Sequence, residues 1–131
     1  MIPEPKWITR EITLALHARQ IAEHGGQDGL RDEHLLLSAL SRPEQLYYCS
    51  DPKPDFCALA AAYAFGLSKN HPFLDGNKRT AFVVYRLFLK WSGVELHAEK
   101  AERYQTMLAL AAGEISESEF CIWLREHTEL L

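Results

Sequence analysis

The segment from Thr80 to Trp91 is almost continuously apolar and carries only two strong charges, Arg86 and Lys90. A run of this length built mainly from Leu, Phe, Val and Ala favours a buried helix over a strand. It follows the cluster 75–77, Asp-Gly-Asn, which is typical of a turn and offers a helix cap. The sequence therefore predicts a buried central helix that begins directly after a turn.

The rest of the chain also spaces its apolar residues as helices do. Helices are expected over about residues 8–22, 32–40, 56–67, 99–112 and 116–124. Pro43 should close the second of these, which leaves residues 41–54 as an irregular and mobile connection. Residues 94–96 are at most a short strand-like turn piece. The prediction is an all-α fold, one compact domain over residues 1–131 with about six helices around the buried central helix.

Composition narrows the class of protein further. Apolar residues make up 47% of the chain and charged residues 24%, as in ordinary globular proteins, and the net charge of −4 argues against broad binding to nucleic acid. The three cysteines show no metal-binding or disulfide spacing, so free thiols in a reducing compartment are expected. Neither a signal peptide nor a membrane-spanning run is found, and a cytoplasmic protein without a membrane partner is expected.

The first turn of the predicted central helix holds Asn77, Lys78 and Arg79. Free N–H groups at a helix start carry about half a positive charge and form an anion site. Cations there oppose the helix dipole by about 0.3–1 kcal/mol each, so Lys78 and Arg79 together are unfavourable for stability unless an anion such as phosphate binds. The alternative is a helix start paired with Asp75, with both cations solvated.

His71 and Asp75 add reactive groups beside this helix start. A histidine can accept a proton near neutral pH, and a carboxylate beside a phosphate is a natural ligand for Mg²⁺. Pro72 should keep His71 in an extended conformation, and Phe73 and Leu74 should anchor the segment to the core. A base, a metal ligand and a phosphate cradle are thus expected within nine residues.

The run His71–Arg79, His-Pro-Phe-Leu-Asp-Gly-Asn-Lys-Arg, resembles the signature of the Fic/Doc superfamily, H-P-F-x-D/E-G-N-x-R. Members of that superfamily move a nucleotide or a phosphate group from a nucleoside triphosphate onto a protein hydroxyl. The resemblance covers most of the chain and includes residues 16–17, 25–26, 29–32, 35–36, 38–40, 60–63 and 92–93. It implies the all-α Fic fold, ATP as substrate and Mg²⁺ as cofactor.

The same resemblance implies a role for each residue of the motif. His71 corresponds to the general base that takes the proton of the target hydroxyl, and Asp75 corresponds to the Mg²⁺ ligand. The phosphate-binding anion hole corresponds to Gly76, Asn77, Lys78 and Arg79. Of these, Lys78 and Arg79 are also expected to act in catalysis.

Two positions depart from the Fic pattern. Lys78 replaces a glycine, and Phe82 stands in place of the second arginine of G-N-G-R-x-x-R. A lysine side chain should crowd the path that glycine leaves for the nucleotide, but it can grip a terminal phosphate. Lys78 resembles the Doc (death-on-curing) branch of toxins, which are described as binding ATP reversed, with the γ-phosphate at the reacting position. The resemblance implies a kinase that inhibits translation by acting on elongation factor Tu.

Two alternatives stay open at this point. The chain could transfer an adenylyl group (AMPylation), as Fic proteins do, or it could be a catalytically silent module that binds nucleotide or an antitoxin. The inhibitory motif of many Fic proteins, S/T-x-x-x-E-G/N, does not occur in the sequence. Restraint is therefore expected from a separate antitoxin protein, through an apolar groove that accepts its helix.

Other candidates have simpler explanations. His17 and His24 lie seven residues apart. That spacing separates them by roughly 10 Å along a helix axis, which is too far for one metal ion, so both are expected to be structural or solvated. Arg31 lies in a stretch that resembles the family and is a candidate ligand, whereas Asp32 is accounted for as a helix N-cap.

Overall fold

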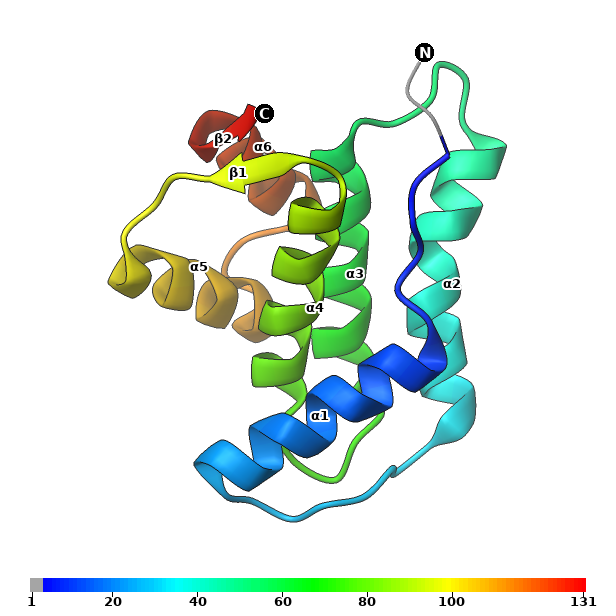
Figure 1. Cartoon of the computed structure of the whole chain (residues 1–131), viewed down its shortest axis with the longest axis vertical. Helices are drawn as coiled ribbons and strands as arrows, with labels where there is room; N and C mark the ends of the chain where they lie inside the picture. Colours follow the sequence, from blue (N-terminus) through cyan, green and yellow to red (C-terminus); the bar gives the residue numbers. More distant parts are fainter. Residues whose placement is uncertain (1–3) are drawn as a thin grey trace.

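The computed structural model describes residues 4–131 and has six helices and two short strands in that range (Figure 1). The all-α fold class predicted from the sequence is confirmed. The elements in chain order are α1 (Arg10–His24), α2 (Glu33–Cys49), α3 (Phe56–Asn70), α4 (Asn77–Trp91), β1 (Val94–Leu96), α5 (Lys100–Ala112), α6 (Glu117–His127) and β2 (Thr128–Leu130).

Two helices, α3 and α4, form the centre of the molecule (Figure 1). Helix α2 and helix α6 pack on α3, while α1 packs on α4. Helix α3 is buried along most of its length, whereas α4 buries one face and exposes Arg79, Arg86 and Lys90. The predicted central helix therefore shares the centre with α3, because the charges of α4 lie on one face that must reach solvent.

Small side chains let α3 approach its neighbours closely. A Cβ atom added to Gly66 would lie 3.2 Å from the Cα atom of Ala39 on α2. Ala60, Ala61 and Ala64 of α3 are also buried, each with an exposed fraction of 1% or less. Short side chains on both helices therefore bring the two backbones together, and this packing fixes where α3 ends and the loop toward α4 begins.

The predicted end of the second helix is wrong. Helix α2 does not stop at Pro43 but continues to Cys49, so most of residues 41–54 are helical rather than irregular. Proline removes a backbone donor and disfavours a helix interior. Here Pro43 is itself buried, on the same helix as the buried residues Ala39, Leu40 and Tyr47. Burial of this apolar face compensates for the local cost of the proline.

A short antiparallel pair of strands closes the C-terminal side of the molecule. Val94 pairs with Leu130, and Leu96 pairs with Thr128. The sequence suggested no more than a turn piece at 94–96, because three-residue strands leave no periodic pattern and their partner lies far along the chain. The predicted N-cap Asp32 is confirmed, and Ser116 caps α6 in a capping box with Glu119. Within residues 4–131, no helix combines the length and apolarity needed to cross a membrane.

Two buried tyrosines of the core differ in one contact. The hydroxyl oxygen of Tyr63 accepts a hydrogen bond from the backbone N–H of Ile8, with 2.9 Å between the heavy atoms. The hydroxyl of Tyr85 is equally buried and has no hydrogen-bond partner among the described residues. Burial raises the pKa of both phenols, so each is neutral at physiological pH.

Replacing these tyrosines with phenylalanine should therefore have opposite effects. Tyr85→Phe removes an unpaired buried hydroxyl and should raise the free energy of unfolding by about 1 kcal/mol. Tyr63→Phe leaves the Ile8 N–H unpaired and should lower the free energy of unfolding by roughly 1–3 kcal/mol. Urea denaturation of the two variants and the wild type measures both effects. Equal destabilisation by the two substitutions would contradict the difference in hydrogen bonding.

Candidate active site

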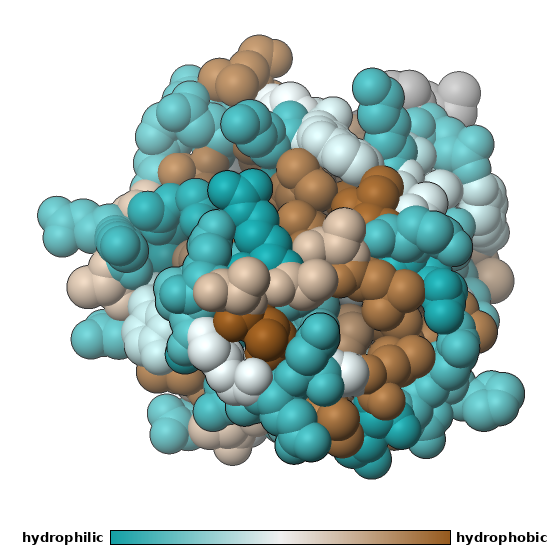
Figure 2. All heavy atoms as spheres, turned by 60° about the horizontal axis from the view of Figure 1, so that its bottom comes forward, coloured by the Kyte–Doolittle hydropathy of each residue, from teal (hydrophilic) through white to brown (hydrophobic). Residues whose placement is uncertain are grey.

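The residues of the predicted motif meet in one cleft at the loop between α3 and α4. The cleft has a volume of about 880 Å³, and helices α1, α4 and α5 line it. Figure 2 shows the molecule with the bottom of Figure 1 turned forward, and on this face apolar patches lie between hydrophilic side chains. All six predicted site residues line this cleft: His71, Asp75, Gly76, Asn77, Lys78 and Arg79.

Helix α4 begins at Asn77, directly after the Asp-Gly turn, as the sequence predicted. Gly76 is the N-cap in the left-handed region, with φ of +76°, and no side chain of residues 4–131 accepts a hydrogen bond from the first-turn N–H groups. Helices α1, α2, α3 and α6 each use a Thr, Asp or Ser side chain for that purpose. The N-terminus of α4 thus offers its backbone donors and its dipole to the cleft.

Lys78 and Arg79 stand on this first turn and are exposed. Neither forms an ion pair with any residue in the range 4–131, Asp75 included. Asp75 instead accepts from the N–H of Gly76 at the helix start, and both cations are exposed, so the alternative of an Asp75-paired helix start with solvated cations stays open beside the anion site. Two cations without an ion-pair partner thus lie beside backbone N–H groups without an acceptor. An anion with several oxygens could bind the cations and the N–H groups together.

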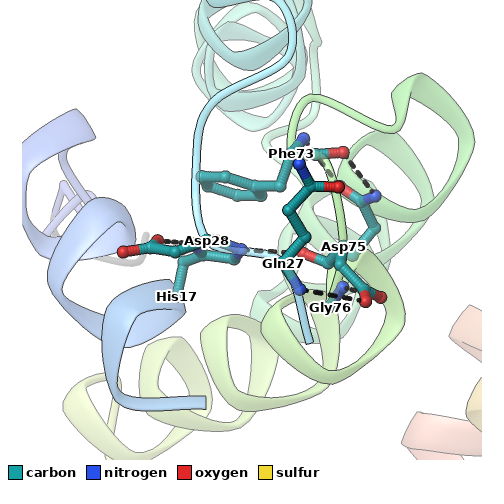
Figure 3. Close-up of polar contacts among 7 residues, drawn as sticks. His17, Gln27, Asp28, Phe73, Asp75 and Gly76 are labelled. Atoms are coloured by element: carbon teal, nitrogen blue, oxygen red, sulfur yellow. Dashed lines mark hydrogen bonds and ion pairs between the residues drawn. The ribbon is translucent and has the colours of Figure 1, made fainter. Parts of the chain in front are cut away.

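The side chain of Asp75 is held by the backbone around it (Figure 3). One carboxylate oxygen accepts from the N–H of Gly76 at 2.8 Å and the other from the N–H of Gln27 at 3.3 Å. Each oxygen keeps a further lone pair that could bind a cation. No group of three or more His, Cys, Asp or Glu suited to a metal occurs within residues 4–131. Asp75 thus fits Mg²⁺, which commonly takes one or two carboxylates and completes its shell with phosphate and water oxygens.

His17 lies beneath the loop and supports it (Figure 3). Its ring is buried and stacks on Phe73 with 3.7 Å between the ring centroids, and Nε2 donates to the carbonyl oxygen of Asp75 at 2.8 Å. The predicted structural role of His17 is confirmed. His24, seven residues further along α1, is exposed at the rim of the cleft.

Asn77 turns its side chain inward rather than toward the cleft. Its Oδ1 accepts from the N–H of Phe73 at 2.9 Å, and its Nδ2 donates to the carbonyl of Phe73 at 3.0 Å. Only its backbone N–H is left for a phosphate. Phe73 is buried, as predicted, but Leu74 is 46% exposed and lines the cleft, so its predicted role as an anchor is wrong.

His71 has a backbone conformation that the sequence did not predict. It ends α3 in the left-handed region, with φ of 50° and ψ of 56°, rather than in the extended conformation expected before Pro72. A non-glycine residue in this region costs about 1 kcal/mol. Contacts to the segment before α2 offset this cost, and they include an isolated antiparallel β-bridge between Leu30 and Phe73. Arg31 takes part in these contacts and does not line the cleft.

A second cleft of about 610 Å³ adjoins the first and shares Val83 with it. Its walls are apolar apart from Arg86, Lys90, Glu95 and Arg103. The Nε atom of Arg103 is buried without a hydrogen-bond partner among the described residues. Burial and the nearby charge of Arg103 lower the pKa of Arg86. Sequence reasoning missed this cluster, because Arg103 lies on α5, whereas Arg86 and Lys90 lie on α4.

Comparison with known proteins agrees with these features. The model of the Fic/DOC family matches residues 7–89. The chain is 31% identical over 118 residues to the Protein kinase doc of Escherichia phage P1, across 90% of this chain and 92% of that protein. It is 41% identical over 75 residues to the Toxin Doc of Mycolicibacterium smegmatis, across 57% of this chain and 58% of that protein. The latter match thus spans little more than half of that relative.

The position of Asp75 can be tested with two adjacent glycines. A Cβ atom on Gly26 would lie 2.7 Å from Oδ2 of Asp75, whereas a Cβ atom on Gly25 would have no neighbour within 4 Å. Both residues have a positive φ, so either alanine should cost stability on the order of 1 kcal/mol. Only Gly26→Ala should shift the ¹H–¹⁵N resonance of Gly76, whose amide donates to Asp75. An unshifted Gly76 amide in Gly26→Ala would contradict this placement.

Proposed function

Because the chain belongs to the Fic/DOC family, we propose that it is a Doc-type toxin that transfers the γ-phosphate of ATP to a hydroxyl group of a target protein. The observation that carries this proposal is the position of His71, which lines the same cleft as the uncapped first turn of α4 with Lys78 and Arg79. A base and an anion site in one cleft suit phosphoryl transfer, where positioning and charge neutralisation supply most of the catalysis.

The proposed reaction uses the described groups as follows. The imidazole of His71 accepts the proton of the target hydroxyl while its oxygen forms a bond to the γ-phosphorus. The bond from that phosphorus to the bridging oxygen breaks, and ADP leaves with the electron pair. Lys78, Arg79 and the first N–H groups of α4 balance the charge on the moving phosphoryl group. A Mg²⁺ ion held by Asp75 would supply further charge neutralisation.

Lys78 favours phosphoryl over adenylyl transfer. Its side chain rises from the turn on which the phosphates would lie, at a position where a glycine would leave the backbone open. A point charge there suits the terminal phosphate of ATP. The similarity to a protein that is named a protein kinase supports the same choice. Adenylyl transfer is the second candidate, since the anion site by itself accepts either orientation of the nucleotide.

We propose translation elongation factor Tu as the target, as the resemblance to the Doc branch implies. We further propose that a separate antitoxin restrains the protein. The second cleft supports this, because it combines apolar walls with three cations that form no ion pair within residues 4–131. An amphipathic helix with acidic residues along one edge would complement both features.

Labelled ATP tests the reaction directly. Incubation with elongation factor Tu and Mg²⁺-ATP labelled at the γ position should label the target, and ATP labelled at the α position should not. His71→Ala should remain folded by circular dichroism and lose transfer by a factor on the order of 10²–10⁴. His34→Ala, which removes an exposed histidine outside the cleft, should retain activity. Label from the α position would favour adenylyl transfer, and no label from either position would favour a binding module.

The antitoxin is tested separately from catalysis. The probe is a synthetic amphipathic helical peptide with acidic residues along one edge, titrated against the purified protein by calorimetry. Arg103→Glu should weaken that binding by a factor on the order of ten or more. Lys6→Glu makes the same charge change on an exposed residue outside both clefts and should have little effect. Equal affinity of the wild type and Arg103→Glu would contradict the assignment of the second cleft.

A further inference from the structure

Arg31 holds three consecutive carbonyl groups at the end of α3. Its Nε donates to the carbonyl of His71 at 2.7 Å, and its Nη2 donates to the carbonyl of Asn70 at 2.9 Å. Its backbone N–H donates to the carbonyl of Pro72, also at 2.7 Å. One residue from the segment before α2 therefore binds the backbone on both sides of His71.

These carbonyls need such a partner because of the backbone of His71. Its left-handed conformation ends α3, so the last carbonyls of the helix lose their helical partners. A cation is also favourable at a helix C-terminus, where the dipole is negative. Arg31 forms no ion pair within residues 4–131, so its donors are free for these carbonyls.

The residues around Arg31 fix it in place. The N–H of Asp32 also donates to the carbonyl of Pro72, and the side chain of Asp32 caps α2 by accepting from the N–H of Leu35. On the other side, the N–H of Leu74 donates to the carbonyl of Gly29 at 3.0 Å. Arg31 is exposed, and its hydrogen bonds make it part of a short brace between the start of α2 and the loop that carries the motif.

We propose that Arg31 is a positioning residue for the general base: by binding the carbonyls of Asn70 and His71, it holds the left-handed turn that directs the His71 ring into the cleft. This inference deepens the proposed function and rests on it. Arg31 acts through His71, since it does not itself line the cleft. Without the guanidinium, residue 71 is free to relax toward the extended conformation that a following proline favours, which would move the ring.

Kinetics of three variants test the proposal. Arg31→Ala should lower kcat by a factor on the order of a hundred, as expected for a misplaced catalytic group, and should leave the KM for ATP nearly unchanged. Arg31→Lys keeps the charge but has a single donor nitrogen in place of the two that Arg31 uses, and it should retain an intermediate rate. The matched control is Arg42→Ala, which removes an arginine that pairs with Glu117 and covers Phe65, away from the loop. It should leave kcat unchanged.

Addition of guanidinium ion at millimolar concentration should restore part of the rate of Arg31→Ala but none of that of His71→Ala. Rescue of this kind would not follow from a general loss of stability. A kcat of Arg31→Ala equal to that of the wild type would overturn the proposal. A rise in KM with unchanged kcat would also overturn it, because it would indicate a role in binding ATP.

A structural readout separates this proposal from the proposed function. In Arg31→Ala, the ¹³Cα shift of His71 should move from the value of its left-handed conformation toward an extended value, and in Arg42→Ala it should not move. This shift is measurable without any transfer activity. If the wild type transfers no label but the shift changes as expected, the proposed function fails and the brace stands. If the shift is unchanged while the wild type is active, the positioning role fails alone. Should Arg31→Ala not fold, Arg31→Lys is measured in the same way.

Discussion

The close packing of α3 on its neighbours is the constraint from which the site follows. Gly66 lets α3 approach Ala39 of α2, and the buried alanines of α3 let it lie against other helices as well. Because interiors are packed at crystal-like density, a helix held on several sides has little freedom to slide or rotate. The end of α3 at Asn70, and with it the start of the loop to α4, is therefore set by the core.

The polar side chains in and around the loop fall into two groups: some bind the loop's backbone, and others face the cleft. Asn77 and the ring of His17 are turned inward and satisfy the backbone of Phe73 and Asp75. Lys78 and Arg79 are turned outward and have no partner within residues 4–131. A loop whose backbone is bonded in this way can hold two cations at a positive helix end, where they reduce stability.

Much of this arrangement could be read from local patterns. The Asp-Gly-Asn cluster and the apolar run after it predicted the start of α4, and the structure begins that helix at Asn77. The N-caps Asp32 and Ser116 were likewise predictable, since a cap depends on residues three positions apart. The errors came where packing outweighs local preference. Pro43 lies within α2 because its helix buries an apolar face, and the strands at 94–96 and 128–130 form only because the segment after α6 returns to the segment after α4.

The order of residues was enough to predict the helical class, the start of α4 and the side chains that stand on its first turn, because these depend on neighbours within one or two helical turns. The orientation of those side chains came from contacts between distant segments. His71 adopts a left-handed conformation although a proline follows it, and Asn77 faces the loop although its neighbours face the cleft. Both outcomes depend on hydrogen bonds to backbone groups, which carry no residue-specific signal. Such partners emerge only when the helices have packed and brought residues 29–35 against residues 70–74.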